Sequence, residues 1–550
     1  MKRIFALLLT AVLVLSLLAG CGSGSSDKPD DKTSPDQENA EFVYDSSKAS
    51  WEQDTSPIEL EWFVAYDWID LGFDPDNNEF DKWIYTDTGI TIKYTIGSQE
   101  KLNVLMATGN LPDIVTYDAV STERENMENS GMLLPLDDLM EKYAPDMQVS
   151  DGMMNWYRNE NDGKWYVWVS YFSDLEEYEK EGVSLESHNM NYARKDIMEA
   201  LNIDPASMTT KEGFIAALQA VKDSGYTYNG QTVIPFIGDE VEYLAEQFGM
   251  DREDAEGNLL NAKRQPEYLE ALLFLNEIYT KGLSTDEIFT MDTTLRRQLV
   301  TSGSVFAGLR QNYLNGKDDL FYTDNNALMM GVGHITGDSG KEAIVSPSTT
   351  AGWAATMITT NCKNPQRAIS LLSFLTQPDV SLSYYYGGVN GYDIIDGQAV
   401  TKPERQEERM ADTTAYDAKY KSSIQDCICN YMWVKKYMQL SNMDALTEDL
   451  YNYTNEWIVG HVFDDKIFTD VAPEGGSDLA AVSAQLNSYW AQQFPLIVMA
   501  ETPEKATQIY NDTIAQMDKT GMAELDEYQN EQFQKNKERM QLEFAWPRNQ

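Results

Sequence analysis

The chain is poor in the residue types from which metal centres and disulfide frameworks are built. Its 550 residues include 4 Cys and 3 His. The histidines lie far apart along the sequence and match no spacing of metal ligands. The motifs G-x-S-x-G and H-E-x-x-H and the P-loop are also missing. We therefore expect no metal, no cofactor and no catalytic residues.

Basic residues are scarce as well. The sequence has 42 Lys and Arg against 89 Asp and Glu, which gives a formal net charge of −47 at pH 7. Nucleic acids and anionic lipid headgroups are bound through basic patches, so a chain this acidic is repelled by both. The same charge is unfavourable for a polyanionic ligand.

No stretch after residue 21 approaches the roughly 20 apolar residues that cross a bilayer. Residues 4–19 are apolar, but they follow two basic residues and have the layout of a secretory signal. They lead into Leu18-Ala19-Gly20-Cys21, which resembles the bacterial lipoprotein box, in which the Cys is lipidated. We predict that residues 1–20 are a signal peptide and that Cys21 carries the lipid. An ordinary signal peptide with an accidental Cys is the alternative.

Residues 21–56 are rich in Gly, Ser, Asp and Lys and contain few apolar side chains. Such a composition buries too little surface to offset its ordering entropy, so this segment is predicted to be a flexible tether. The folded part then begins near Ile58. An odd number of cysteines remains beyond the lipidated one, which offers no disulfide framework. We expect these three to be packed side chains: Cys362, Cys427 and Cys429.

Strand and helix patterns alternate from residue 58 to about residue 400, which predicts an α/β fold. The first unit has strands at 60–66, 90–96 and 111–115 and helices at 80–88 and 99–108. Gly89 and Gly109 follow these helices, where a left-handed residue is favoured. Further strands are predicted at 166–169 and 304–309, and further helices at 192–201, from 210, at 266–280 and from 365. The last third is predicted to be mainly helical.

Seven segments stand in a fixed order along the mature chain: LMATGNLPDIV (105–115), LLPLDDLMEKYAPDM (133–147), NYARKDIMEALNID (191–204), PEYLEALLFLNEIYTKGLSTDEIFT (266–290), TSGSVFAGL (301–309), ITTNCKNPQRAISLLSFLTQPD (358–379) and YYYGGVNGYD (384–393). Together they resemble the family 1 extracellular solute-binding proteins, specifically the long Gram-positive lipoproteins of carbohydrate ABC importers. Each segment alone is a weak signal, and the set covers nearly the whole mature chain.

The resemblance implies a two-lobed fold like that of periplasmic binding proteins, with a hinge, an interlobe ligand cleft and a helix-rich C-terminal part. Lobe 1 is expected at residues 57–170 plus 346–398, and lobe 2 at 171–345 plus 399–550. The implied function is that of a monomeric, lipid-anchored subunit on the outer face of the cell membrane. It captures an oligosaccharide and delivers it to ABC permease subunits, which work with a cytoplasmic ATPase.

Carbohydrates are bound by aromatic platforms together with planar hydrogen-bonding side chains. Such mixtures stand where the predicted strands end and near the expected lobe crossings. On this ground we predict these ligand-binding residues: Tyr66, Asp67, Trp68, Tyr117, Asp118, Trp168, Arg310, Tyr313, Trp353 and Tyr392. Arg194 joins them on the resemblance alone, with a structural ion pair as its alternative. For each aromatic residue the alternative is packing in the core or on the surface.

Two other functions stay open: a receptor for peptide or another solute on the same fold, and a surface glycosidase. A glycosidase needs one carboxylate of raised pKa facing another across the sugar. Abundant acidic residues are no signal for that in so acidic a chain. The segment 74–78 has the alternating oxygen ligands that begin a calcium loop, but Glu79 stands in place of the Gly at position six and Tyr85 in place of the Glu at position twelve. A polar turn is the alternative.

The predicted anchor depends on one thiol. Replacing Cys21 with Ala is expected to release the protein from the membrane fraction or to leave an unprocessed precursor, because no lipid can then be attached. Cell fractionation of the two forms, with metabolic labelling by a palmitate analogue, measures this. A cleaved, unlipidated form that stays in the membrane fraction would contradict the anchor.

Overall fold

The computed structural model describes residues 42–183, 189–289, 291, 293–309, 316–347, 350–438, 445–473 and 475–547. The predicted lipidation residue Cys21 and two predicted binding residues, Arg310 and Tyr313, lie outside this part of the chain. So do the predicted signal peptide and most of the predicted tether. Within the described ranges, no helix is both long enough and apolar enough to cross a membrane.

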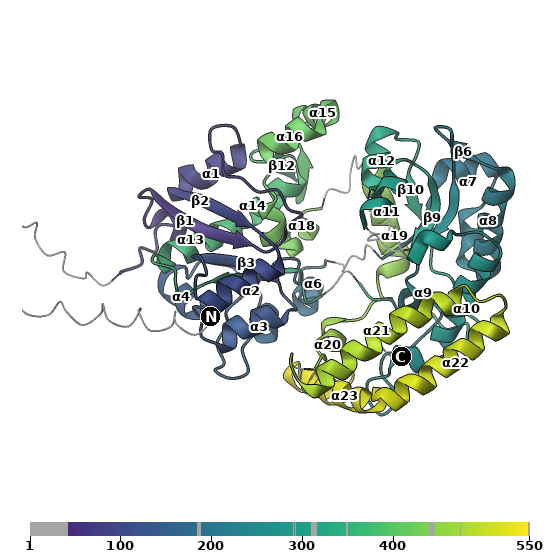
Figure 1. The fold of residues 1–550 in the computed structure, drawn as a ribbon. Helices are drawn as coiled ribbons and strands as arrows, with labels where there is room; N and C mark the ends of the chain where they lie inside the picture. The colour runs from purple at the N-terminus through teal and green to yellow at the C-terminus, as the bar shows by residue number, and fades with distance from the viewer. Residues whose placement is uncertain are drawn as a thin grey trace, which may run out of the picture. The chain divides into compact units, whose positions relative to one another are not determined.

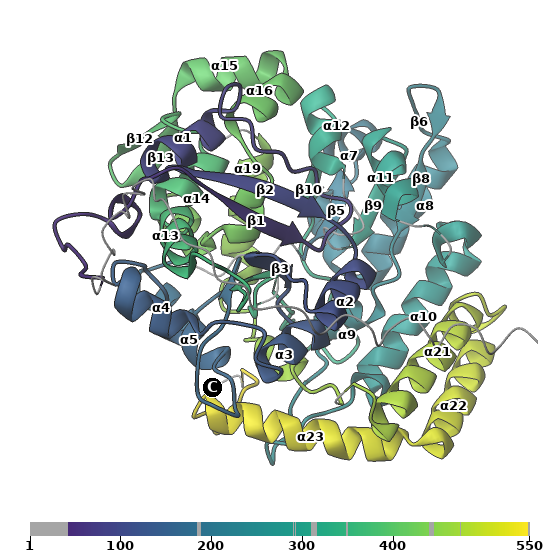
Figure 2. The same ribbon diagram turned by 60° about the vertical axis from the view of Figure 1, so that its left-hand side comes forward.

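The first sheet has five strands in the order β2-β1-β3-β11-β4. The strands β1 (Ile58–Val64), β2 (Ile90–Ile96) and β3 (Ile114–Asp118) are parallel, as their alternation with helices predicts (Figure 2). The strand β11 (Ala354–Ile358) comes from much later in the chain and pairs antiparallel to β3. The edge strand β4 (Trp168–Val169) pairs antiparallel to β11.

The first two helices end where the sequence predicts. The helix α1 (Glu79–Thr88) begins at Asn78, whose side chain accepts hydrogen bonds from two backbone N–H groups of the first turn. It stops at Gly89, and α2 (Gln99–Thr108) stops at Gly109. Both glycines have left-handed backbones, with φ of 69° and 67°. Glycine adopts this conformation without the strain that a Cβ brings.

Helix α17 (Ile424–Ile428), in the segment after residue 399, packs in the core of the first sheet. The helices α15 (Pro403–Ala411), α16 (Thr413–Tyr420), α17 and α18 (Tyr431–Lys436) were expected in lobe 2. Ile424, Cys427 and Ile428 of α17 belong to the hydrophobic core of the first sheet, and the Asn78 side chain donates to the carbonyls of Ala418 and Lys421. A helical pattern says that one face is buried, but it does not say against which sheet.

The other helices around the first sheet are α3 (Thr122–Asn129), α4 (Leu136–Tyr143), α5 (Asp151–Trp156), α13 (Pro365–Leu375) and α14 (Pro378–Tyr385). Figure 1 shows these helices around the sheet. Trp62, Phe63 and Trp168 are fully buried in the core of this part of the chain. The helix α13 begins at Pro365, as predicted, and proline suits the first turn, whereas the Asn364 side chain makes no capping hydrogen bond.

The second sheet has the order β10-β5-β9-β8, and its strands are β5 (Asn191–Arg194), β8 (Ile234–Ile237), β9 (Val305–Leu309) and β10 (Met329–Gly331). Here the sequence prediction of a helix over 192–201 is wrong at its start. Residues 191–194 form the buried strand β5, and the helix α7 covers only Lys195–Leu201. The polar residue Asn191 hides the strand pattern, because its side chain is satisfied internally by Gln247 and the carbonyl of Gly333.

The remaining helices are α6 (Leu175–Lys180), α8 (Lys211–Ser224), α9 (Val241–Gln247), α10 (Pro266–Thr280), α11 (Thr293–Thr301), α12 (Lys317–Thr323), α19 (Ala445–Tyr453) and α20 (Lys466–Thr469). Two short hairpins are formed by β6 (Thr227–Tyr228) with β7 (Gln231–Thr232) and by β12 (Tyr392–Ile395) with β13 (Gln398–Thr401). The helix predicted from residue 210 is confirmed as α8, which the Thr210 side chain caps by accepting a hydrogen bond from Gly213 N. The buried side chains around the second sheet form a core of their own, separate from that of the first sheet.

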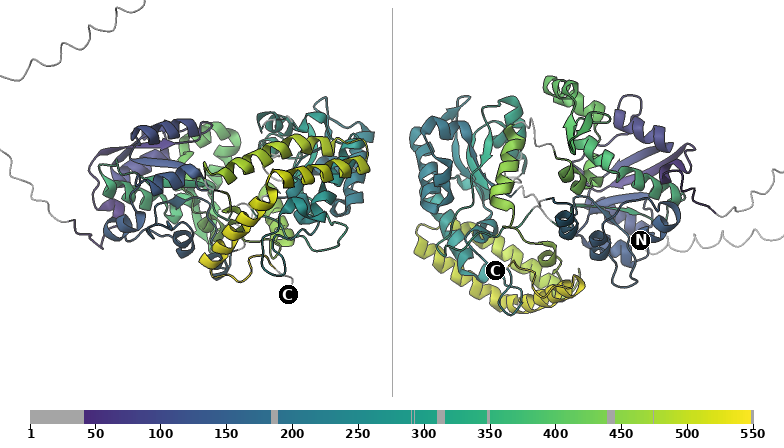
Figure 3. Two further views of the ribbon diagram at one scale, coloured as in Figure 1. Left: turned by 60° about the horizontal axis from the view of Figure 1, so that its bottom comes forward. Right: turned by 180° about the vertical axis from the view of Figure 1, so that it is seen from behind.

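Three long helices end the chain: α21 (Asp478–Val498), α22 (Pro503–Thr520) and α23 (Met522–Arg539). They appear in yellow in Figure 3, where α21 and α22 lie side by side. The Asn276 side chain of α10 donates to the carbonyls of Val498 and Ala500 and so holds α21 against the second-sheet core. Phe533 and Trp546 belong to the first-sheet core. The C-terminal part therefore joins both cores.

The chain passes between the two cores more than once. Residues 170–173 leave β4 toward the second sheet, and residues 345–347 and 350–353 belong to the return from it to β11. The two segments are bonded to each other, since Trp353 N donates to Ser170 O and Ser173 N donates to Thr350 O. The carboxylate of Asp465, from a later part of the chain, accepts a hydrogen bond from Thr350 N. We call residues 170–173 the first crossing segment and residues 345–347 with 350–353 the second, and together they are the crossing segments.

Two glycines offer a matched test of the first α/β unit. A Cβ added to Gly89 would lie 2.1 Å from the carbonyl oxygen of Thr55, whereas one added to Gly109 would meet nothing within 4 Å. Gly109→Ala is expected to lower the free energy of unfolding by about 1–2 kcal/mol, the penalty of a left-handed alanine. Gly89→Ala should lose more, because the Thr55 backbone must also shift. Urea denaturation measures both, and equal losses would contradict the steric argument.

Candidate functional site

Three aromatic rings stack where β1 ends. Tyr66 and Trp68 follow β1 in sequence, and Trp353 lies just before β11. The Trp353 ring is 5.0 Å from Tyr66 at an interplanar angle of 29° and 5.9 Å from Trp68 at 22°. Tyr66 is buried, whereas Trp68 is 66% exposed. We call these three residues the aromatic platform. Its Trp68 ring is the one that is open to solvent.

Hydrogen-bonding groups stand beside the platform. The Tyr66 hydroxyl donates to Asp118 Oδ1 at 2.7 Å, and the Tyr117 ring is 6.1 Å from that of Tyr66. Burial, and then the neighbouring Asp118, raise the pKa of Tyr66 far above its ordinary value, so this phenol stays a donor. Asp118 is half-buried and Asp67 is exposed. Six predicted residues thus come together. Tyr66, Trp68 and Trp353 form the platform, and Asp67, Tyr117 and Asp118 stand beside it.

A second row of polar side chains lies near Tyr117 and was missed by the sequence analysis. Gln99 at the start of α2 donates to Glu123 Oε1 at 2.6 Å, and Asn103 donates to the same oxygen at 3.4 Å. Burial first, and then Asp118 and Glu123, raise the pKa of Tyr117. Gln99 and Glu123 come just after strands β2 and β3, so the strand-end signal that selected Tyr117 was available for them.

The position of Trp353 is set by its backbone. Trp353 N donates to Ser170 O at 2.9 Å, and Trp353 O accepts from Ala119 N at 2.8 Å. The preceding Gly352 has φ of +85°, and a Cβ there would lie 2.6 Å from Ser170 O. Only glycine fits this close approach, which brings the two crossing segments together. The platform is therefore built partly on a crossing segment.

Tyr171, also missed from the sequence, packs beside the platform. Its ring is 6.4 Å from that of Trp353 and 5.2 Å from that of Tyr431. Its hydroxyl lies 2.7 Å from the Tyr385 hydroxyl and donates to the Asp426 carboxylate. Tyr171 is the second residue after strand β4, and this strand-end position is the signal that could have found it.

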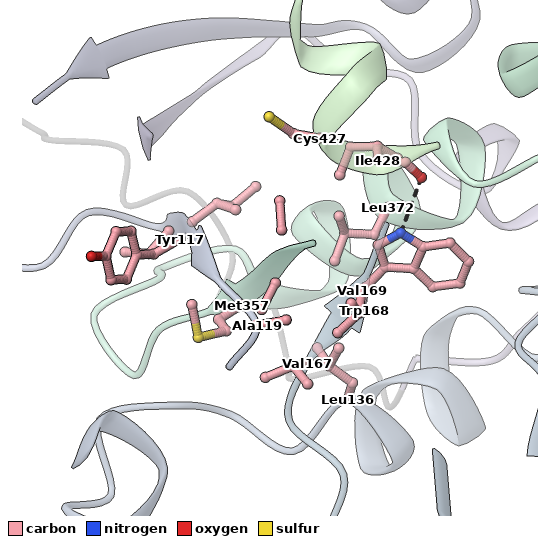
Figure 4. Close-up of a cluster of buried hydrophobic side chains, with 14 of the residues drawn as sticks. Tyr117, Ala119, Leu136, Val167, Trp168, Val169, Met357, Leu372, Cys427 and Ile428 are labelled. Carbon is pink, nitrogen blue, oxygen red and sulfur yellow. Dashed lines mark hydrogen bonds between the residues drawn. The ribbon is translucent and has the colours of Figure 1, made fainter. Parts of the chain in front are cut away.

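Three predicted residues have other partners. Trp168 is fully buried in the first-sheet core, where its indole N–H donates to Ile428 O (Figure 4). Arg194 is fully buried and makes a two-bond ion pair with Asp196, at 2.8 and 2.7 Å, which is the structural role given as its alternative. Tyr392 lies in the β12–β13 hairpin, and its hydroxyl donates to the carboxylate of Asp379. No contact of these three side chains with the platform is found among the described residues.

The segment 74–78 forms a polar turn. Asn78 N donates to Asp74 O at 2.8 Å, and the Asn77 side chain donates to the Asp74 carboxylate at 2.8 Å. The Asn78 side-chain oxygen caps α1. These oxygens are engaged in holding the turn. In the described ranges, no group of three or more His, Cys, Asp and Glu side chains is placed to hold a metal ion.

A cavity of about 260 Å³ lies away from the platform, next to the C-terminal segment, and Trp546, Lys341 and Glu253 are among its lining residues. Glu253 accepts hydrogen bonds from Lys537 Nζ and from the backbone of Ala545 and Trp546. Its buried carboxylate therefore holds the C-terminal segment in place. The platform remains the candidate site, because it combines exposed aromatic surface with nearby carboxylates.

Residues 79–395 match the family model described as bacterial extracellular solute-binding protein. A curated protein, the fructooligosaccharide ABC transporter substrate-binding protein FusA of Streptococcus pneumoniae serotype 4, is 26% identical over 315 residues. The alignment covers 52% of this chain and 53% of FusA, so the chain spans about half the length of that curated relative.

Solved structures share the fold. FusA of S. pneumoniae in complex with kestose has a TM-score of 0.63 at 17% identity, over 88% of this chain and 100% of that one. The alginate-binding protein AlgQ2, in a crystal structure without calcium ion, has a TM-score of 0.60 at 18% identity, over 88% and 100% of the two chains. These likenesses confirm the predicted α/β fold class.

Two predicted tryptophans should differ in what they do for stability. Trp168→Ala is expected to lower the free energy of unfolding by about 3–5 kcal/mol, because it leaves a cavity in the core and an unpaired Ile428 carbonyl. Trp68→Ala should lose about 1–2 kcal/mol, since it removes the ring contacts that a mostly exposed side chain makes with Tyr66 and Trp353. Urea denaturation compares the two. A larger loss at Trp68 would mean that its exposed position is not the native one.

Proposed function

This chain belongs to the bacterial extracellular solute-binding protein family, and we propose that it is the substrate-binding subunit of an ABC importer that captures an oligosaccharide on the aromatic platform. The family consists of binding proteins for transport and not of enzymes. The curated relative with a matching sequence bears the name of a fructooligosaccharide transporter subunit. We carry over the ligand class, carbohydrate, and not the particular sugar.

The observation that carries this proposal is the stack of Tyr66, Trp353 and Trp68. A sugar ring presents C–H groups on its faces and hydroxyls around its edge. The C–H face packs on an aromatic ring, while carboxylates accept hydrogen bonds from the hydroxyls. Trp68 offers the ring, and Asp67 and Asp118 stand beside the platform as acceptors. Covering the open Trp68 ring also removes apolar surface from water.

The two sheets and their separate cores support a two-lobed receptor. We propose that the first-sheet core is lobe 1 and the second-sheet core is lobe 2, with residues 403–436 in lobe 1. Ligand binding then closes the lobes by a hinge motion at the crossing segments. Because Trp353 stands on one of these segments, a ligand that stacks on the platform acts next to the hinge.

The export and partner assignments complete the proposal. The N-terminal pattern supports removal of residues 1–20 and lipid attachment at Cys21, which would hold the protein at the outer face of the cell membrane. The relative's name, which includes "ABC transporter substrate-binding protein", supports delivery to a permease with a cytoplasmic ATPase. A monomer is proposed as the working form.

A ligand panel with one platform variant tests the function. Kestose, longer neutral oligosaccharides, alginate oligosaccharides and peptides are screened by thermal shift, because a ligand that binds only the folded protein raises its melting temperature. We expect a neutral oligosaccharide to raise it. For that ligand, Trp68→Ala should weaken binding measured by calorimetry by roughly thirtyfold, equal to about 2 kcal/mol.

Tyr85→Ala is the control, since Tyr85 is a 41% exposed aromatic residue on α1 outside the platform, and its affinity should stay that of the wild type. A shift with peptides alone would favour the peptide receptor. Release of shorter sugars from the oligosaccharides would favour a glycosidase. Equal affinity of Trp68→Ala and wild type would reject the platform as the site.

A further inference from the structure

Tyr171 has an unusual backbone for a bulky residue. Its φ is +57°, in the left-handed region that side chains with a Cβ rarely adopt. It is the second residue of the crossing segment 170–173, directly after β4. A conformation of this kind is unfavourable by itself and persists only where the surroundings hold it in place. The contacts of Tyr171 therefore indicate which surroundings stabilise this backbone conformation.

Three later segments of the first-sheet core hold Tyr171. Its backbone N–H donates to Cys429 O at 3.1 Å. Its hydroxyl donates to the carboxylate of Asp426 on α17 and lies 2.7 Å from the hydroxyl of Tyr385, the last residue of α14. The ring of Tyr431, at the start of α18, packs 5.2 Å away. Both the backbone and the side chain are thus fixed.

Burial keeps the phenols of this cluster protonated, so they remain hydrogen-bond donors. Burial raises the pKa of the Tyr171 and Tyr385 phenols well above their ordinary values, so both stay protonated. Burial also raises the pKa of Asp426, while the hydrogen bond from Tyr171 and the charge of Lys421 act in the opposite direction. Asp426 is the acceptor of the network, because the phenols supply the protons.

Tyr171 also contacts the Trp353 ring of the platform. Its ring centroid is 6.4 Å from that of Trp353, which itself stacks on both Tyr66 and Trp68. The backbones are also linked, since Trp353 N donates to Ser170 O. Tyr171 therefore contacts the platform through its ring and belongs to the crossing segment through its backbone.

We propose that Tyr171 is a positioning residue, which Asp426 and Tyr385 hold against Trp353 so that the platform keeps its stacked geometry and ligand stacking is linked to the crossing segment. The Tyr171 hydroxyl contributes to this position, because it joins the side chain to Asp426. The backbone contact with Cys429 does not depend on the hydroxyl. The part of this proposal that concerns a ligand rests on the proposed function. The position of Trp353 is tested on the protein without ligand.

The first measurement uses protein labelled with 5-fluorotryptophan. The chain has 12 Trp, and the resonance that disappears in Trp353→Phe identifies Trp353. We expect Tyr171→Phe, which keeps the ring and removes the hydroxyl, to shift the Trp353 resonance. Asp426→Ala should cause the same shift, whereas Asp426→Asn, which keeps an acceptor oxygen, should restore the wild-type position.

Tyr243→Phe is the matched control. The Tyr243 hydroxyl donates at 2.5 Å to Asn189 O and is buried with the second-sheet core, so this variant also removes a buried hydroxyl. Its Trp353 resonance should stay in place. An unmoved Trp353 resonance in Tyr171→Phe, or an equal shift in Tyr243→Phe, would overturn the proposal.

The second measurement is affinity for the oligosaccharide that the ligand panel identifies, with kestose as the first probe. Tyr171→Phe should weaken binding about fivefold, the effect of one net hydrogen bond. Asp426→Asn should bind like the wild type. If no oligosaccharide binds the wild type, the proposed function fails, while the fluorine shifts still decide the position of Trp353. If the resonance shifts and the affinity does not change, Tyr171 does not position the platform for the ligand.

Discussion

The pairing of β11 with β3 is the contact on which the rest of the structure depends. Strand β11 enters the first sheet from about 240 residues away in sequence, and the hydroxyls of Thr116 and Thr356 meet across the pair at 2.8 Å. The Trp62 indole donates to the same Thr116 oxygen. This buried polar contact joins β1, β3 and β11. It places Trp353, just before β11, beside Tyr66 and Trp68, just after β1.

The same pairing explains why the platform and the crossing segments share residues. Because β11 runs antiparallel to β3, its first residue, Ala354, pairs with Asp118, the last residue of β3. The residues that lead into β11 therefore lie where β1 and β3 end. Trp353 is one of them, and Gly352 before it permits the close approach to Ser170. A strand-end site in an open α/β sheet is expected on general grounds. Here the return segment itself supplies part of that site.

The C-terminal part adds a second link between the cores. Lys537 and Glu253 form a buried ion pair at 2.7 Å, and the Asn536 side chain donates to the carbonyls of Ile467 and Asp470. Glu253 also accepts from two backbone N–H groups, so its charge is satisfied although it is buried. Removing one partner of such a pair is costly, because the other charge stays buried and unpaired. The segment after α23 is therefore held by the Glu253 carboxylate and, through Trp546, by the first-sheet core.

The amino-acid sequence determined the local features of this protein. Its apolar alternation predicted the parallel strands β1, β2 and β3, and Gly89 and Gly109 predicted the ends of α1 and α2. Aromatic and acidic residues at strand ends also predicted Tyr66, Asp67, Trp68 and Asp118, whose role in binding remains a prediction. Each of these signals depends on neighbours within a few residues, through backbone conformation or periodic burial.

Only the tertiary structure decided which distant residues meet. Trp68 and Trp168 both stand near strand ends, yet one is exposed on the platform and the other is buried against Ile428. Likewise, nothing in the pattern of residues 403–436 says which sheet these helices cover, and Tyr171 is hydrogen-bonded to Asp426, 255 residues away. The physical reason is that periodicity specifies a buried face, whereas the partner of that face is chosen by long-range strand pairing and packing.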